Sequence, residues 1–121
     1  MQMKRKDVLY LAVVIAMVLG GIYEVTSLGN APDKYDDFAE CLTGNGIIMY
    51  GTDWCPHCKD QKTMFGRSFR YINYVNCDSE RLECDAAGVS GYPTWFISGS
   101  NYPGTQSLEQ LSKLSNCSLS S

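Results

Sequence analysis

The chain has 121 residues and a mass of 13.5 kDa, enough for one small domain. Hydrophobic residues make up 45% and charged residues 19%, proportions that exclude a disordered or collagen-like chain. The formal net charge is -3, and without the first 30 residues 7 basic residues remain against 11 acidic ones. Such an acidic domain lacks the basic surface that binding to a phosphate backbone requires, so we expect no nucleic-acid partner.

The N-terminal segment predicts targeting to a membrane. Basic residues at positions 4–6 precede 16 uncharged residues, Val8 to Tyr23. A spanning helix needs about 20 apolar residues and a signal-peptide core about 7–15, and this segment lies between the two. We interpret residues 1–29 as an uncleaved signal-anchor. The alternatives are a cleaved signal peptide and a buried core helix, although the stretch from Val8 to Leu19 shows no polar face. Both leading interpretations place the rest of the chain on the extracytoplasmic side, where disulfides form.

Residues 30–117 alternate helical and strand patterns. After a short linker at 28–33, the apolar spacing and the glycine positions predict helices at 33–42, 55–65, 79–87 and 108–114, and strands at 47–50, 72–75, 94–97 and near Tyr102. Ser107 and Gln110 have the spacing of a capping box at the start of the last helix. Residues 118–121 read as a frayed, serine-rich tail. This alternation predicts an α/β sandwich.

The motif Trp54-Cys55-Pro56-His57-Cys58 follows a predicted strand and turn and opens a predicted helix. A helix N-terminus stabilises a thiolate, which is the nucleophile in disulfide exchange. We therefore expect Cys55 to be the exposed attacking thiol and Cys58, one turn further along, to be the buried resolving thiol. Pro56 suits the first turn of a helix. His57, the only histidine, can place a charge or a hydrogen bond beside the Cys55 thiolate, which would make the pair a stronger oxidant.

Two other interpretations of the same cysteines fit the sequence less well. A zinc site would need a second cysteine pair at similar spacing, whereas six residues separate the next two cysteines, Cys77 and Cys84. A purely structural disulfide would be unusual at a helix N-terminus beside the single histidine. We accordingly expect no metal and no organic cofactor.

A second motif, Gly91-Tyr92-Pro93-Thr94-Trp95, places a proline at the entry to a predicted strand, where an ordinary edge residue could also stand. Together with the dithiol motif it resembles the thioredoxin superfamily over roughly residues 46–114. The resemblance implies a three-layer sandwich around a four-stranded mixed sheet. It also implies that Pro93 is a cis-proline facing the dithiol, and that the backbone beside it pairs with a substrate peptide.

The match is narrower with the thioredoxin-like domain fused to vitamin K epoxide reductase homologues of bacteria and plants. It rests on the residues from Tyr50 to Cys58, Tyr74-Val75, the Pro93 motif, and Tyr102-Pro103-Gly104 with Gln106-Ser107-Leu108. In those fusions a membrane bundle reduces a quinone, and we expect this chain to supply only the redox-partner half. One position departs from thioredoxin itself. Met49 stands six residues before Cys55, where thioredoxins carry a buried acid, and this weakens a thioredoxin-like reductant reading.

The remaining cysteines can pair in three ways once Cys55 and Cys58 are paired. Cys77 ends a predicted strand and Cys84 lies in the next helix, so a local bridge is geometrically reasonable. By elimination Cys41 would then pair with Cys117 and tie the two ends of the domain together. The alternatives are unpaired thiols and a redox-relay role for the Cys77–Cys84 pair.

The function that these features favour is an extracytoplasmic thiol–disulfide oxidoreductase acting on secreted or membrane proteins, more as an oxidant than as a reductant. We assign substrate contact to Trp54, Tyr92, Pro93 and Thr94, although aromatic residues at such positions often only pack. The alternatives are a disulfide reductase or isomerase, and a redox-inactive binding or chaperone-like module. The expected reoxidant is a separate quinone-linked membrane reductase of the vitamin K epoxide reductase or Dsb type.

Overall fold

The computed structural model describes residues 3–28 and 33–119, and it divides into an N-terminal helix and a compact unit that begins at Asp33. Residues 29–32 of the linker predicted at 28–33 and the last two residues of the predicted tail lie outside the described residues. The tail's first two residues, 118 and 119, have no helix or strand assignment.

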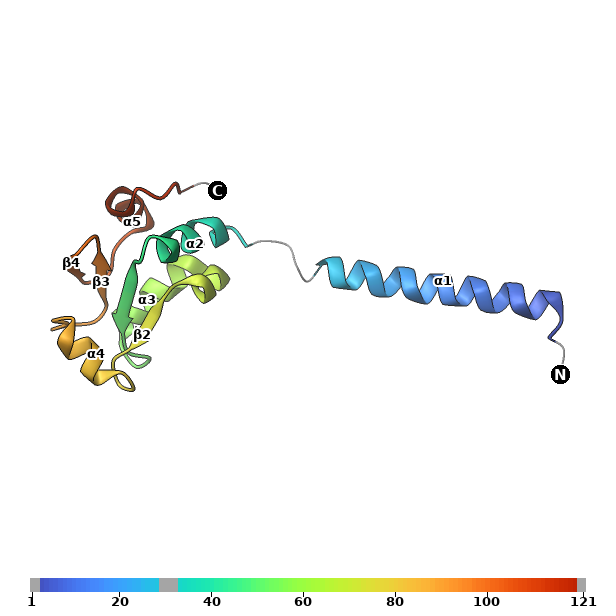
Figure 1. Cartoon of the computed structure of the whole chain (residues 1–121), viewed down its shortest axis with the longest axis horizontal. Helices are drawn as coiled ribbons and strands as arrows, with labels where there is room; N and C mark the ends of the chain where they lie inside the picture. The colour runs from blue at the N-terminus through green and yellow to red at the C-terminus, as the bar shows by residue number, and fades with distance from the viewer. Residues whose placement is uncertain (1–2, 29–32, 120–121) are drawn as a thin grey trace. The chain divides into compact units, whose positions relative to one another are not determined.

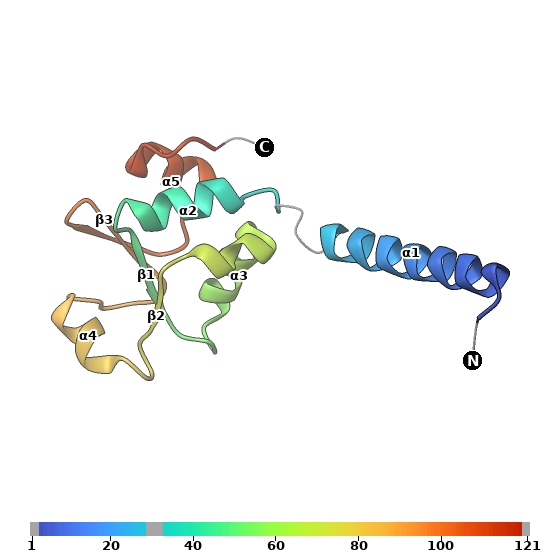
Figure 2. The ribbon, with the colours of Figure 1, turned by 45° about the vertical axis from the view of Figure 1, so that its right-hand side comes forward.

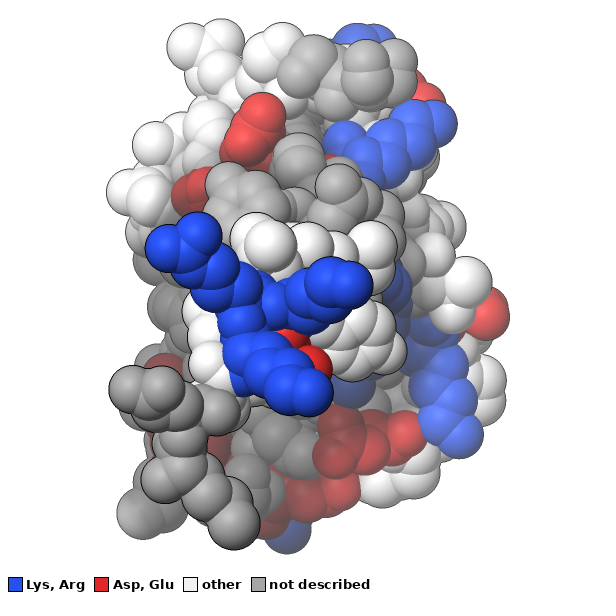
Figure 3. Space-filling model, turned by 90° about the vertical axis from the view of Figure 1, so that its right-hand side faces the viewer, with Lys and Arg blue, Asp and Glu red and all other residues white. Residues whose placement is uncertain are grey.

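The N-terminal helix α1 runs from Arg5 to Leu28, so the helix expected over the apolar segment is present. Its large hydrophobic side chains from Val8 to Leu19 are exposed in the structure. Basic side chains gather at the start of α1, where Lys4, Arg5 and Lys6 stand in the sequence (Figure 3). Within residues 3–28 and 33–119, none of the helices combines the length and hydrophobicity that a membrane-spanning segment requires.

Four strands form one mixed sheet in the order β2-β1-β3-β4 (Figure 1). The strands are β1 (Ile48–Gly51), β2 (Tyr74–Asn76), β3 (Thr94–Ile97) and β4 (Ser100–Pro103). β1 pairs in parallel with β2 and antiparallel with β3, and β4 is antiparallel to β3. The predicted four-stranded mixed sheet is therefore correct, with boundaries shifted by one or two residues at the first two strands.

Helices cover both faces of this sheet. They are α2 (Asp36–Gly44), α3 (Pro56–Phe65), the 3-10 helix η1 (Gly66–Tyr71), α4 (Arg81–Ala86) and α5 (Leu108–Ser115). Side chains alternate along a strand, so Met49 and Trp95 contribute to one core cluster, with α2, α3 and α5. Tyr50 and Ile48 belong to a second cluster with α4. Both views show α4 apart from the other three helices (Figures 1 and 2).

The helix boundaries follow from local sequence. Gly66 ends α3 with a positive φ of 57°, a conformation that glycine adopts at low cost. The Ser107 hydroxyl accepts a hydrogen bond from the backbone N–H of Gln110 at 3.1 Å, as the capping pattern predicts. The 3-10 helix η1 was not expected from the sequence, because residues 66–71 lack an apolar repeat long enough to mark a helix.

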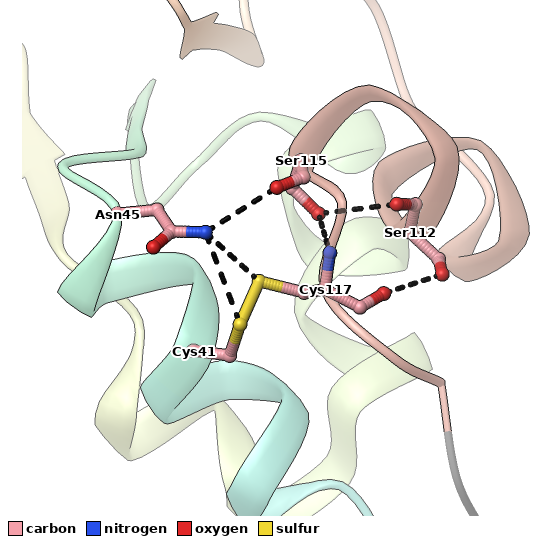
Figure 4. The surroundings of a disulfide bond; sticks show 5 residues. All are labelled: Cys41, Asn45, Ser112, Ser115 and Cys117. Carbon is pink, nitrogen blue, oxygen red and sulfur yellow. Dashed lines mark hydrogen bonds between the residues drawn. A yellow bond between two sulfur atoms is a disulfide. The ribbon is translucent and has the colours of Figure 1, made fainter.

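Two disulfides close the domain, with the pairing favoured by the sequence. Cys41 of α2 is bonded to Cys117 beyond α5, and Cys77 is bonded to Cys84 of α4. The side-chain amide of Asn45 lies beside the first bridge and donates to the carbonyl of Ser115 and to the sulfur of Cys117, both at 3.3 Å (Figure 4). The first and last helices of the domain are thus held together by a covalent bond and by hydrogen bonds.

Candidate active site

The sulfur of Cys55 lies at the N-terminus of α3. Cys55 is the N-cap residue and Pro56 the first residue of the helix, so the proline removes no amide that the helix would use. The backbone N–H of Cys58 donates to the Cys55 sulfur at 3.3 Å. This amide and the positive end of the helix dipole both favour a thiolate at Cys55.

Cys55 is less accessible than the sequence analysis expected. Only 5% of the residue is exposed, because the segment that contains Tyr92 lies against it. The Cys55 thiol donates to the carbonyl oxygen of Tyr92 at 3.6 Å. The expected order is retained, since Cys58 is 0% exposed. A partner sulfur must therefore react with a Cys55 that is largely covered.

The thiol of Cys58 is held in its neutral form. Burial raises its pKa from an ordinary value of 9.0 to about 11, and the hydrogen bond with Cys55 acts in the same direction. Both residues carry free thiols in this structure. The two sulfurs of one motif thus have different surroundings, as attacking and resolving roles require.

The peptide bond between Tyr92 and Pro93 is cis, as the thioredoxin resemblance implies. Pro93 is fully buried, and its carbonyl accepts a hydrogen bond from the backbone N–H of Gly104 at 2.7 Å. The Tyr92 carbonyl faces the Cys55 thiol. The structure therefore brings the two sequence motifs together at one site.

Two of the predicted substrate-contact residues form an exposed aromatic pair. Trp54 is 64% exposed and Tyr92 36% exposed, and their rings meet edge to face with centroids 6.3 Å apart. The Trp54 indole N–H donates to the carboxylate of Asp78 at 2.9 Å, which fixes the orientation of the ring. Thr94 differs from the expectation of substrate contact. Its side chain is buried and its hydroxyl donates to the Gly91 carbonyl at 2.7 Å.

His57 follows Pro56 in the first turn of α3 and is exposed. Its backbone carbonyl accepts a hydrogen bond from the hydroxyl of Thr105 at 3.4 Å. The segment after β4 therefore contacts the active-site helix as well as the proline segment.

Gln61 is a buried polar residue that the sequence analysis missed. Its side-chain oxygen accepts from the indole N–H of Trp95 at 2.9 Å and from the backbone N–H of Gln106 at 2.8 Å. Its side-chain nitrogen donates to the Gln106 carbonyl at 3.0 Å. Only one feature of the sequence pointed to this network. Gln61 is a polar residue one turn after Cys58, on the helix face that also carries Phe65.

Asp53 also has a larger role than that of an exposed turn residue. Its carboxylate accepts hydrogen bonds from Lys62 at 3.1 Å, from the Tyr74 hydroxyl at 3.0 Å and from the Asn76 amide at 3.0 Å. The hydrogen bond from Lys62, followed by that from Tyr74, lowers the pKa of Asp53. These partners come from α3 and β2, so only the folded chain brings them to the turn.

The described residues include no group of three or more histidine, cysteine, aspartate or glutamate side chains that could hold a metal ion. Cys77 and Cys84, the further cysteines that a zinc site would have needed, are bonded to each other. The contacts of Cys55 come from one helix N-terminus and one proline segment.

No protein family model matches the chain. It is 36% identical over 90 residues to thiol-disulfide oxidoreductase LTO1 of Arabidopsis thaliana, which covers 67% of this chain and 24% of that protein. It is 36% identical over 84 residues to protein disulfide isomerase-like 2-2 of Oryza sativa subsp. japonica, covering 58% of this chain and 23% of that protein. These sequence relatives support the thioredoxin-like resemblance. The chain spans about a quarter of the length of these curated relatives.

Among solved structures, the oxidized form of mitochondrial thioredoxin 3 from Saccharomyces cerevisiae matches with a TM-score of 0.44 and 15% identity, covering 58% of this chain and 76% of that one. Oxidized glutaredoxin 2 from Chlamydomonas reinhardtii matches with a TM-score of 0.40 and 21% identity, covering 69% of this chain and 94% of that one.

Proposed function

We propose that the chain is a thiol–disulfide oxidoreductase that exchanges disulfides with cysteine-containing proteins through Cys55 and Cys58. One observation carries the proposal: the Cys55 sulfur accepts a helix-terminal N–H and faces the Tyr92 carbonyl, while Cys58 is buried and neutral beside it. In the oxidising direction a client thiolate attacks Cys55 of the Cys55–Cys58 disulfide. A second client thiolate then resolves the mixed disulfide, and the dithiol remains on this chain.

Trapping of mixed disulfides tests this assignment. A Cys58→Ala variant should accumulate covalent complexes with client proteins, because the resolving thiol is missing. A Cys55→Ala variant should accumulate few, because Cys58 is 0% exposed. The complexes are counted on non-reducing gels, and treatment of a second sample with dithiothreitol should remove them. Equal trapping by the two variants would contradict the roles assigned to the cysteines.

We infer that the pair acts as an oxidant. Pro56-His57 between the cysteines and the apolar Met49 in place of a buried acid both support this direction. Equilibration with glutathione measures the potential, and a value near that of thioredoxin, about -270 mV, would overturn the inference. A His57→Ala variant should be more reducing than the parent, whereas an equal potential would assign the effect to the helix terminus alone.

We propose further that α1 attaches the domain to a membrane, with the dithiol on the extracytoplasmic side. The exposed apolar side chains of α1 and the basic residues at its start support this placement. Alkaline carbonate extraction combined with determination of the mature N-terminus tests it. We expect the chain in the pellet with Met1 retained. A soluble product that begins near residue 28 would indicate a cleaved signal peptide.

A quinone-linked membrane reductase of the vitamin K epoxide reductase or Dsb type is the reoxidant that we propose. An oxidant that has released its product holds two additional electrons and needs an acceptor for them. Attachment of both proteins to one membrane would raise their effective concentration. Deleting such a reductase should leave Cys55 and Cys58 reduced in the cell, which alkylation of free thiols detects. A pair that stays oxidised would exclude this partner as the main route.

A further inference from the structure

The position of Met49 leaves the resolving sulfur without a carboxylate in the neighbouring strand. Met49 is fully buried in β1, and its partner in the parallel strand β2 is Tyr74. Tyr74 is therefore the residue with a titratable side chain that pairs with Met49 in the sheet, since the partner of Met49 in β3 is Trp95.

Gly51 shows how close Tyr74 lies to the resolving cysteine. A β-carbon on Gly51 would lie 3.0 Å from the sulfur of Cys58 and 3.2 Å from ring atom Cε2 of Tyr74. The thiol and the aromatic ring therefore both border the space that the missing side chain leaves open. This is a close approach that only glycine permits.

Lys62 places a positive charge at the same location. It lies four residues after Cys58 in α3, so the two side chains are on the same face of the helix. The Lys62 ammonium lies 4.1 Å from the centroid of the Tyr74 ring and 3.1 Å from the Asp53 carboxylate. The Tyr74 hydroxyl donates to that carboxylate as well. Asp53 and Tyr74 thus hold the Lys62 ammonium on the Cys58 side of α3.

The titratable groups that face Cys58 are Cys55 and Lys62 from the active-site segment and Tyr74 from β2. Burial, the largest effect, raises the pKa of Cys58, and a backbone hydrogen bond from Thr52 lowers it. Lys62 is the only positive charge among these groups, and it lowers the pKa further by a smaller amount. Its side chain is 27% exposed and that of Asp53 is 68% exposed. An ion pair with this exposure adds little to stability. Stability therefore gives little reason for a lysine on the Cys58 face of α3.

We propose that Lys62, held by Asp53 and Tyr74, stabilises the thiolate of Cys58 during disulfide exchange and takes the place of the absent buried acid as the charged group beside this sulfur. The proposal rests on the oxidoreductase function proposed above. When a client thiolate attacks Cys55, the client–Cys55 bond forms and the Cys55–Cys58 bond breaks. The electron pair of the broken bond leaves on Cys58, and this thiolate then takes a proton from solvent.

Titration of the reduced protein tests the charge effect without any need for activity. The NMR chemical shift of the 13C-labelled β-carbon of Cys58 is followed against pH in the parent chain and in Lys62→Met, Lys62→Arg and Lys59→Met variants. Lys59 is the matched control, since it is an exposed lysine of the same helix. The high-pH thiol transition should move upward by about half a pH unit or more in Lys62→Met. It should stay in place in Lys62→Arg and Lys59→Met.

The rate at which glutathione attacks the oxidised protein provides the functional measurement. At pH 7 we expect Lys62→Met to react about twofold more slowly than the parent, or slower still, with Lys62→Arg restored to the parental rate. Circular dichroism verifies folding, and Lys62→Gln replaces Lys62→Met if the latter unfolds. If the thiol transition shifts in Lys62→Met but neither the parent nor any variant exchanges disulfides, the oxidoreductase function is refuted. An unshifted Lys62→Met titration in a protein that does exchange disulfides would overturn the role of Lys62.

Discussion

Three cysteine pairs lie within one domain, and two of them are closed while the third is open. Cys41 and Cys117, 76 positions apart, are joined in a disulfide, as are Cys77 and Cys84, which are 7 positions apart. Cys55 and Cys58 remain thiols at the start of α3. Burial does not distinguish the closed pairs from the open pair, because Cys77 and Cys84 are as inaccessible as Cys55.

The difference lies in the groups around the sulfur atoms. The amide of Asn45 donates to a sulfur that is already in a disulfide and has no charge to stabilise. At the open pair, the donor to Cys55 is a backbone N–H at a helix N-terminus, and a carbonyl faces the same sulfur from the proline segment. The helix end, and not accessibility, therefore marks the reactive pair.

Removal of each closed pair should have the largest effect, and the two effects should differ. The chain-entropy model assigns about 4 kcal/mol to a loop as long as that of Cys41–Cys117 and about 2 kcal/mol to one as short as that of Cys77–Cys84. Urea unfolding of the two double alanine variants measures both. Equal losses would show that contacts of the bridges, and not loop length, determine their contribution.

Substitution of Gly51 should disturb the open pair specifically. An alanine β-carbon would lie 3.0 Å from the Cys58 sulfur, so we expect Gly51→Ala to lose up to about 3 kcal/mol of unfolding free energy. Gly44→Ala is the control, because nothing lies within 4 Å of a β-carbon at this helical position, and it should be neutral or stabilising. A Gly51→Ala protein as stable as the parent would mean that Cys58 can move aside freely.

The pH dependence of stability should differ between the reduced and the oxidised protein. The Cys58 thiol ionises near 9 in the unfolded chain and near 11 in the folded one, where burial opposes the thiolate. Below about pH 9 the neutral thiol of Cys58 therefore makes its full contribution to the free energy of unfolding. This contribution is lost as the pH rises through 11. The reduced protein should lose at most about 2 kcal/mol more than the oxidised one over this range. Parallel denaturation curves would contradict the assigned burial effect.

The smallest effect concerns the hydroxyl of Thr52, which lies one residue beyond Gly51. It is buried without a hydrogen-bond partner among the described residues, so Thr52→Val should stabilise the protein by about 1 kcal/mol. Thr43 is the matched control, since its hydroxyl donates to the Tyr71 carbonyl and accepts from Asn73 N–H. Thr43→Val should therefore be destabilising, as thermal unfolding will show. A destabilised Thr52→Val protein would indicate that the hydroxyl has a partner after all.

The sequence allowed prediction of the features that depend on short-range patterns. The motif from Trp54 to Cys58, the strand at 94–97 and the start of the last helix are recognisable because glycine, proline and capping residues act locally. The four-stranded mixed sheet followed from the family resemblance and not from periodicity, and the strand order was not predicted. The predicted accessibility of Cys55 was wrong, because the covering segment comes from a distant part of the chain.

The parts that could not be predicted depend on long-range contacts of polar residues. Gln61 reads as an ordinary helix residue until Trp95 and Gln106 are brought against it. Asp53 reads as a solvated turn residue until β2 supplies Tyr74 and Asn76. A hydrogen bond between residues more than 20 positions apart leaves no periodic mark in a single sequence.

The side chain of Gln61 also affects the geometry of the dithiol site. Because it binds Trp95 on β3 and both backbone groups of Gln106, the active-site helix and the strand that follows Pro93 are fastened to the same segment. The Gly104 amide extends this fastening to the carbonyl of Pro93. The sulfur of Cys55 and the Tyr92 carbonyl consequently belong to one rigid frame. The conformational entropy of aligning the sulfur and the carbonyl is lost when the chain folds. A client protein therefore binds to a site whose geometry is already fixed.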